Sequence, residues 1–185
     1  MNTAFDLAEI KRRMAASIGV LKNDFAGLRT GRASANLLDP ILVEAYGSKM
    51  HLREVASISV PEPRTISVQV WDRALVSAVD KAIRDANLGL NPSVDGQIVR
   101  VSIPELTAER RQELVKAAHK YSENARVAVR HVRRDGMDAL KKKEKEGMGE
   151  DEVKRMTEQV QKATDESITE IDKMLATKEK DITQV

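Results

Sequence analysis

Residues 107–146 read TAERRQELVKAAHKYSENARVAVRHVRRDGMDALKKKEKE, and this stretch constrains the architecture of the chain most strongly. Small or apolar side chains recur along it at spacings of three and four, the period of a helix with one buried stripe. The stripe comprises Val115, Ala118, Ser122, Ala125, Val129, Val132, Gly136 and Ala139. Thr107 is a suitable N-cap and Pro104 fits just before it, so we predict one helix over 107–146, about 60 Å long.

Two other stretches have the same period. Residues 3–29 carry apolar side chains at Leu7, Ile10, Met14, Ile18, Leu21, Phe25 and Leu28, and Thr3 with Asp6 resembles a capping box. A third helix is expected after Gly149, with a stripe of Val153, Met156, Val160, Ala163, Ser167, Ile171, Met174 and Lys178. Because each helix has a single stripe to bury, the three stripes predict a three-helix bundle.

The segment 31–104 has a different period. Alternation predicts strands over 41–46, over 56–60 with an end at Pro61, around Ile66 to Val70, and around Val99 to Ile103. Residues 75–86 predict a helix that is closed by Gly89 and by Asn91-Pro92. We therefore expect an α+β protein in which residues 1–30 and 105–185 form the long bundle and residues 31–104 form a small inserted domain. The joints near 30–33 and 103–106, at Gly31, Arg32, Pro104 and Glu105, are expected to act as a hinge.

Composition excludes several classes of protein. The chain of 185 residues has no cysteine, which excludes disulfide frameworks, thiolate metal sites and thiol nucleophiles. Its longest uncharged stretch, Ala86 to Val94, is nine residues, whereas a spanning helix needs about 20. The N-terminal residues lack the pattern of a leader peptide. We expect a soluble, cytoplasmic protein with no membrane partner, and a monomer.

Little in the sequence indicates catalysis. His51, His119 and His131 have no metal-ligand spacing, and the nucleophile-elbow and phosphate-loop motifs are absent. The inserted domain has His51 as its only histidine and offers no convergent acid pair, which disfavours a hydrolase or transferase site. We therefore expect no enzyme activity, no cofactor and no metal site.

The charge of the long central helix is the most informative feature. Residues 110–134 hold eight basic side chains and two acidic ones, a net +6, although the whole chain has a net charge of only +2. On a helical wheel Arg126, Arg130, Arg133 and Arg134 form a ridge about 110° from the buried stripe. One interpretation is a solvated face that pairs with the third helix. The other is a surface that follows phosphates, and the absence of aromatic side chains from the ridge favours the backbone of folded RNA over base stacking.

Three motifs carry a resemblance to a known family. They are LRTGRAS at residues 28–34, NLGLNP at residues 87–92 and ARVAVRHVRRD at residues 125–135. Together, in this order and over the whole length of the chain, they resemble the ribosome recycling factor family.

The resemblance implies a near-L-shaped protein with a three-helix bundle and a small β/α/β sandwich domain. Such a protein binds the post-termination ribosome in the intersubunit space and, with elongation factor G and GTP, splits it into subunits so that mRNA and tRNA are released. The positions matched to contacts with large-subunit rRNA are Arg133, Arg130 and Arg29, followed by Arg126, Arg134 and Arg32.

The chain departs from the family pattern at three positions, His131, Gly136 and Glu105, where Asn, Ala and Pro are usual. Gly136 is expected to soften the long helix, and Glu105 to loosen the joint. The alternative function is a helical scaffold or adaptor protein with a basic RNA-binding face, which would self-associate.

Overall fold

The computed structural model describes residues 5–28 and 30–184. The chain divides into two compact units. Among the described residues, one unit contains 5–28 and 112–180, and the other contains 30–111 and 181–184. The first unit holds most of three long helices, and the second holds the strands.

The first helix, α1, spans Leu7–Ala26. It begins at Asp6, whose side chain accepts a hydrogen bond from the backbone N–H of Glu9 at 3.1 Å. The helix is therefore shorter than the predicted 3–29, and Thr3 of the expected capping box lies outside the described residues. The predicted stripe is confirmed at its centre, because Ile10, Met14, Ile18, Leu21 and Phe25 are all buried.

The second long helix, α4, spans Ala108–Lys145. Thr107 is its N-cap as predicted, since Thr107 Oγ1 accepts from the N–H of Arg110 at 3.1 Å. The predicted stripe is buried from Ala118 to Gly136, but its two ends are wrong. Leu114 and Leu140 are buried where Val115 and Ala139 were expected. In each case a larger leucine on the neighbouring position removes more apolar surface from water.

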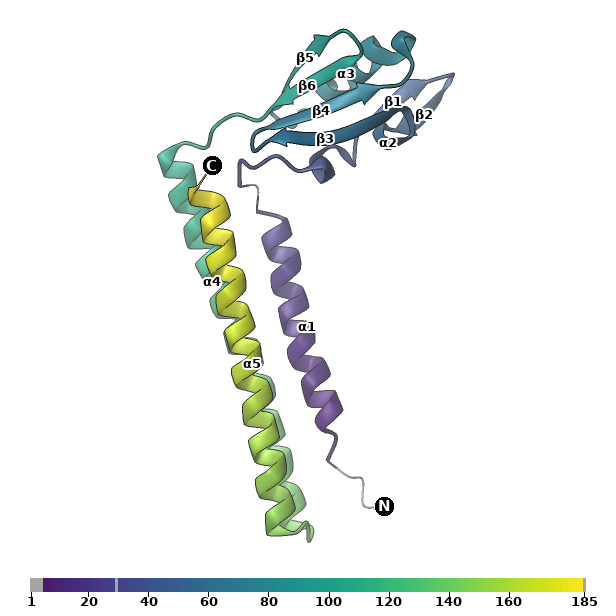
Figure 1. Ribbon diagram of the computed structural model, residues 1–185. Helices are drawn as coiled ribbons and strands as arrows, with labels where there is room; N and C mark the ends of the chain where they lie inside the picture. Colours follow the sequence, from purple (N-terminus) through teal and green to yellow (C-terminus); the bar gives the residue numbers. More distant parts are fainter. Residues whose placement is uncertain (1–4, 29, 185) are drawn as a thin grey trace. The chain divides into compact units, whose positions relative to one another are not determined.

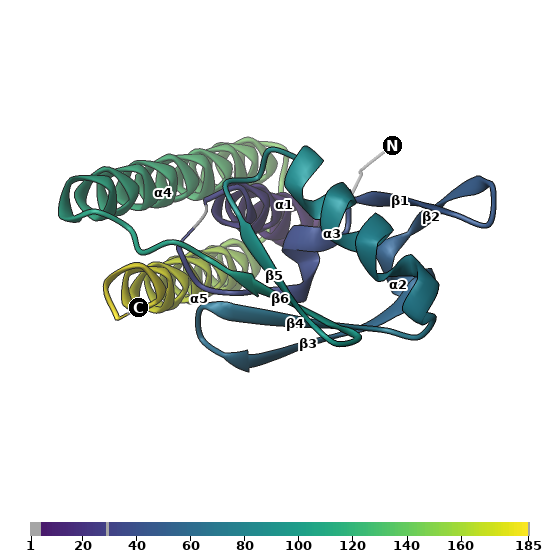
Figure 2. The same cartoon turned by 90° about the horizontal axis from the view of Figure 1, so that it is seen from above.

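The third long helix, α5, spans Glu150–Thr183 and runs beside α4 and α1 in both views (Figure 1, Figure 2). Val160, Ala163 and Ile171 of its predicted stripe are buried. The three helices meet at Gly136, where an added Cβ would lie 3.4 Å from Ile10 Cδ1 of α1 and 3.4 Å from Val160 Cγ1 of α5. The glycine thus lies at a close approach of three helices, and α4 continues through it without interruption.

The second unit is an α+β domain built from short elements. In chain order these are the 3₁₀ turn Ala35–Leu38, β1 (Leu42–Ala45), β2 (Ser48–His51), α2 (Leu52–Val55), β3 (Ala56–Glu62), β4 (Thr65–Val70), the 3₁₀ turn Arg73–Leu75, α3 (Val76–Asp85), β5 (Asn91–Asp95) and β6 (Ile98–Ser102). Strands β3-β4-β6-β5 form an antiparallel sheet in that order, and β1 with β2 forms a separate hairpin. One face of the sheet is covered by α3, whose Val79 and Ile83 are buried (Figure 2).

Two prolines lie inside strands of the sheet. Pro61 lies in β3, where the pairing with β4 shifts register between Ser59 and Glu62. Pro92 lies in β5 opposite Val101. Both strands are at an edge of the sheet, where a missing N–H breaks no ladder. The expected strand end at Pro61 is therefore wrong, because β3 continues to Glu62. The predicted helix over 75–86 does end before Asn91-Pro92, since α3 finishes at Asp85.

Aromatic side chains are exposed at the end of the sheet where β4 finishes. Tyr46 lies in the two-residue turn of the β1–β2 hairpin with φ +51°, followed by Gly47 with φ +80°, and two positive φ values define a type I′ turn. The Tyr46 hydroxyl donates to Asp72 Oδ2 at 2.6 Å. Trp71, the single tryptophan of the chain, is 61% exposed just after β4.

Candidate nucleic-acid interface

The candidate interface is the arginine ridge of α4, which we define as Arg126, Arg130, Arg133 and Arg134. All four belong to the first unit and project from one continuous helix, so their spacing is fixed by the backbone. Their surroundings differ, however, because α5 packs along one side of the ridge.

Arg126 is committed to neighbouring carboxylates. Its side chain is only 17% exposed. Nε and Nη2 donate to Asp172 Oδ1 of α5 at 3.0 and 2.6 Å, and Nη1 donates to Glu123 Oε2 at 3.1 Å. The hydrogen bond to Asp172 raises the pKa of Arg126 above its usual value. At Arg126 the structure therefore shows the face that pairs with the third helix, and this arginine ties α4 to α5.

Arg130 and Arg134 face outward. The Arg130 side chain is 52% exposed, and its Nη1 reaches Glu123 Oε1 only at 3.5 Å, the outer limit of a hydrogen bond. Arg130 could exchange this weak contact for a phosphate oxygen with little loss of stability to the protein. Arg134 is exposed, and its charge helps to lower the pKa of neighbouring Asp135.

Arg133 is held by a neutral side chain. It is half-buried, and its Nε donates to Gln161 Oε1 of α5 at 2.8 Å. Gln161 Nε2 in turn donates to Asp165 Oδ1 at 2.9 Å. Because Gln161 carries no charge, the positive charge of Arg133 is positioned without being neutralised by its direct partner.

The acid next to the ridge is paired on the side of α1. Asp135 Oδ2 accepts from Arg13 Nη2 at 2.7 Å. That hydrogen bond is the main cause that lowers the pKa of Asp135, and the charges of His131, Arg13 and Arg134 add to it. His131 Nε2 lies 3.8 Å from the same carboxylate, so the histidine that departs from the family pattern faces Asp135.

The two remaining predicted contacts are not part of the ridge. Arg29 lies outside the described residues. Arg32 belongs to the second unit, and its Nη1 forms an ion pair with Asp181 Oδ1 at 3.0 Å. Its side chain is 59% exposed.

The two joints contain one close contact and one ion pair. Gly31 has φ +74°, and a Cβ at this position would lie 2.9 Å from Leu106 Cγ, so glycine is required here. Glu105, where proline is usual in the family, pairs with Arg64 Nη1 at 2.8 Å. The departure at Glu105 thus adds a contact to this joint in place of the ring.

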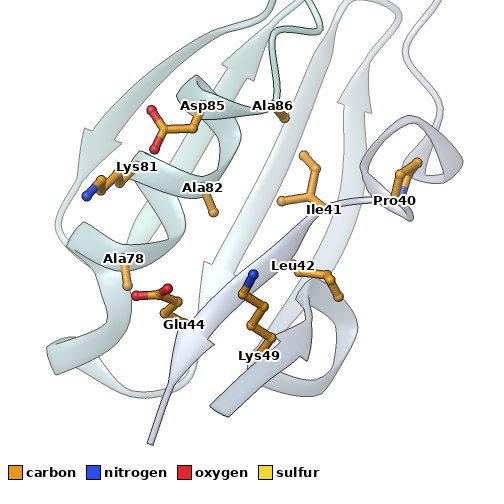
Figure 3. A pocket seen from close by; sticks show the side chains of 10 residues that line it. All are labelled: Pro40, Ile41, Leu42, Glu44, Lys49, Ala78, Lys81, Ala82, Asp85 and Ala86. Atoms are coloured by element: carbon orange, nitrogen blue, oxygen red, sulfur yellow. The ribbon is translucent and has the colours of Figure 1, made fainter. Parts of the chain in front are cut away.

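Other kinds of site find less support. The best-defined hollow of the second unit, about 380 Å³, lies between the β1–β2 hairpin and α3 (Figure 3). Apolar side chains such as Ile41 and Ala82 line it, and Glu44, Lys49, Lys81 and Asp85 add charges of both signs. Over residues 5–28 and 30–184, no three His, Asp or Glu side chains gather as a metal site. In the same ranges no helix is long and apolar enough to span a membrane.

Sequence reasoning located the ridge but missed its partners on α5, Gln161 and Asp172. Asp172 lies 46 positions from Arg126 and Gln161 lies 28 positions from Arg133. The available signal was the antiparallel order of the two helices, which places later residues of α5 beside earlier residues of α4. Using it requires the relative rotation of the helices, and the apolar stripes fix that only coarsely.

Comparison with known proteins gives a consistent result. The family model described as "Ribosome recycling factor" matches residues 21–183. The ribosome-recycling factor of Xanthobacter autotrophicus is 65% identical over 182 residues, covering 98% of this chain and 97% of the relative. That of Azorhizobium caulinodans is 64% identical over 186 residues and covers 100% of both chains.

Solved structures agree with the sequence matches. A solution structure of the ribosome recycling factor superposes with a TM-score of 0.71 at 48% identity, covering 96% of this chain and 95% of that one. A second structure, described as the T. thermophilus factor with E. coli elongation factor G bound to the E. coli post-termination complex, gives a TM-score of 0.61 at 46% identity and covers 95% of each chain. With a family model over most of its length and relatives above 60% identity, this chain belongs to the ribosome recycling factor family.

Proposed function

We propose that this chain recycles post-termination ribosomes. Its bundle binds large-subunit rRNA in the intersubunit space and, together with elongation factor G and GTP, it splits the ribosome into subunits so that mRNA and tRNA are released. The family is one of non-enzymatic factors, so GTP hydrolysis belongs to the elongation factor. The solved relative bound with elongation factor G to the post-termination complex supports this proposal. The proposal places the chain in the cytoplasm, with the ribosomes on which it acts.

The observation that carries the rRNA contact is the environment of Arg133. Its guanidinium is fixed through Nε by a neutral amide, and the Nη groups remain for a phosphate. A planar guanidinium binds phosphate oxygens in a bidentate manner, which suits a backbone contact. The ridge itself has no aromatic side chain for stacking on bases, so its fit is to the phosphates of folded RNA.

The other arginines have different parts in the proposal. Exposed Arg130 and Arg134 extend the positive surface beside Arg133 and provide further phosphate contacts. Arg126 acts mainly by fixing α4 to α5 through Asp172. Arg29 and Arg32 remain candidate contacts on the strength of their match to the family motif.

We further propose that the two joints form the hinge of the factor. A domain joined to the bundle by two strands of chain has few covalent constraints on its rotation. Gly31 supports the proposal because its left-handed backbone turns the chain sharply beside Leu106. Pro104 and the Glu105–Arg64 ion pair belong to the second joint.

The test is light scattering of post-termination ribosomes mixed with the protein, cognate elongation factor G and GTP. We expect a drop in scattering that requires all three components. Arg133→Ala is expected to weaken binding to large ribosomal subunits by about 1–3 kcal/mol, the value of a charge-assisted hydrogen bond. Arg155→Ala is the matched control, because it removes an exposed arginine of α5 outside the ridge.

Two outcomes would refute the proposal. No drop in scattering with the cognate elongation factor would leave the helical adaptor as the better description. A folded Arg133→Ala variant that binds as tightly as the wild type would remove Arg133 from the interface.

A further inference from the structure

We propose that Gln161 is a positioning residue that holds the Arg133 guanidinium ready to receive an rRNA phosphate. The inference rests on the proposed contact between Arg133 and rRNA. It assigns a role to a side chain of α5 that lies behind the arginine. Gln161 acts through Arg133 and makes no contact with RNA in this proposal.

The orientation of the Gln161 amide is fixed by its second partner. Asp165 lies one turn further along α5 and is an acceptor only, so the Gln161 nitrogen must face it, at 2.9 Å. The amide oxygen consequently points to α4, where it accepts from Arg133 Nε at 2.8 Å. The chain Asp165–Gln161–Arg133 therefore has one consistent direction of hydrogen bonding.

The hydrogen bond restrains the guanidinium and leaves its binding edge open. Donation from Nε uses one of five N–H groups. Within residues 5–28 and 30–184, the four N–H groups of Nη1 and Nη2 have no hydrogen-bond partner. The two Nη atoms together present a pair of parallel donors, which is the arrangement that binds two phosphate oxygens.

Arg126 shows what a charged partner does at an equivalent place. Asp172 of α5 also faces an arginine of α4, but it is a carboxylate and it receives both Nε and Nη2. That arginine is 17% exposed and its charge is compensated within the protein. The same two helices thus carry one arginine neutralised by an acid and one arginine restrained by an amide. Only the second arrangement keeps a full positive charge for an external anion.

Restraint before binding should increase affinity. An arginine side chain that is free in the unbound protein loses rotamer freedom when it binds, and that loss weakens the complex. A side chain already held by Gln161 has lost most of this freedom in advance. Removal of the amide should therefore weaken binding by about three- to tenfold while the phosphate contact itself persists.

The experiment measures binding of the full-length protein to large ribosomal subunits at several salt concentrations. Gln161→Met keeps the length of the side chain and removes the hydrogen bonds. Gln159→Met is the matched control, because it makes the same change two residues away on the same helix. Gln161→Glu replaces the amide by a carboxylate and should weaken binding more than Gln161→Met, by compensating the arginine as Asp172 does at Arg126. Each variant is also made in an Arg133→Ala background.

We expect Gln161→Met to weaken binding about three- to tenfold, and Gln159→Met to leave it unchanged. In the Arg133→Ala background Gln161→Met should have no further effect, because the residue acts only through Arg133. The slope of log affinity against log salt should stay at the wild-type value for Gln161→Met, and should fall by roughly 0.7–0.9 for Arg133→Ala, which loses one phosphate contact. A merely structural role would produce the same loss of affinity in both backgrounds.

The outcomes separate this inference from the proposed function. If Arg133→Ala binds normally, the rRNA contact fails and the positioning role fails with it. If Arg133→Ala weakens binding but Gln161→Met does not, or weakens it equally in both backgrounds, the contact stands and the positioning role is overturned. Tighter or unchanged binding by Gln161→Glu would also overturn it.

Discussion

Replacement of Gly136 by alanine tests how closely the three helices pack. Alanine in a helix interior is favoured over glycine by about 1 kcal/mol. The added methyl group would lie 3.4 Å from Ile10 Cδ1 and from Val160 Cγ1, at the near edge of ordinary contact, and 3.6 Å from Ile10 Cγ1. Burial of one carbon contributes up to about 0.8 kcal/mol. We therefore expect Gly136→Ala to raise the free energy of unfolding by about 1–2 kcal/mol.

Gly19→Ala is the matched control for the backbone contribution. Gly19 also lies in a helix interior, and a Cβ at that position has no neighbour within 4 Å. Its expected gain is only about 1 kcal/mol. Urea unfolding followed by far-UV circular dichroism gives both free energies by linear extrapolation. A lower stability for Gly136→Ala than for the wild type would show that the packing at this point cannot accept a methyl group, and would refute the estimate.

Three other changes have definite expected results. Ser122→Ala should raise the free energy of unfolding by about 0.5–2 kcal/mol, measured in urea, because the buried Ser122 Oγ has no hydrogen-bond partner among the described residues. Gly31→Ala should destabilise its joint by about 1–2 kcal/mol and speed hydrogen exchange of the neighbouring N–H of Ala33, since alanine disfavours positive φ; unchanged exchange would contradict this. Asp135 should titrate below its ordinary pKa in carboxyl NMR, so its contribution to stability is present above the unfolded pKa and is lost as the pH falls through the folded value. Arg13→Met should bring that pKa back up, and no change would contradict the pairing.

The helices were predictable because their determinants are local. A stripe with a period of 3.6 residues identifies the buried face of α1 from Ile10 to Phe25, whatever it packs against. The ends were less predictable because neighbouring residues compete for the same role. Asp6 caps α1 by bonding to the N–H of Glu9, a choice that depends on local backbone geometry. Competition between neighbours also explains why Leu114, and not the predicted Val115, is buried at the start of the stripe of α4.

The sheet was less predictable because the effect of a proline on a strand depends on where that strand lies in the sheet. A proline ends a strand that is central in a sheet and is tolerated in a strand at an edge. Pro61 and Pro92 both lie in edge strands. The residues around each proline do not indicate whether its strand is central or at an edge. The order β3-β4-β6-β5, which places both prolines in edge strands, is set by the fold of the whole domain.

The ridge was predictable because its arginines lie on one face of one helix. Which of these arginines are neutralised by neighbouring residues was not predictable. The helical wheel places Arg126 and Arg133 side by side, yet the first faces Asp172 and the second faces Gln161. The difference between a neutralised and an available arginine is decided by α5. To predict which arginines of a helix are available for binding, one therefore also has to know which residues of the neighbouring helix face them.

The single, exposed tryptophan, Trp71, allows the unfolding of one unit to be followed separately by spectroscopy. It is the only indole of the chain, it lies in the inserted domain and it is already 61% in contact with solvent. Its native emission should already be close to that of water-exposed indole, so unfolding is followed by the intensity of its fluorescence, which reports on that domain alone. Circular dichroism is instead dominated by the long helices. Denaturation curves from the two signals with separate midpoints would show that the units melt independently, and coincident curves would show a single cooperative transition.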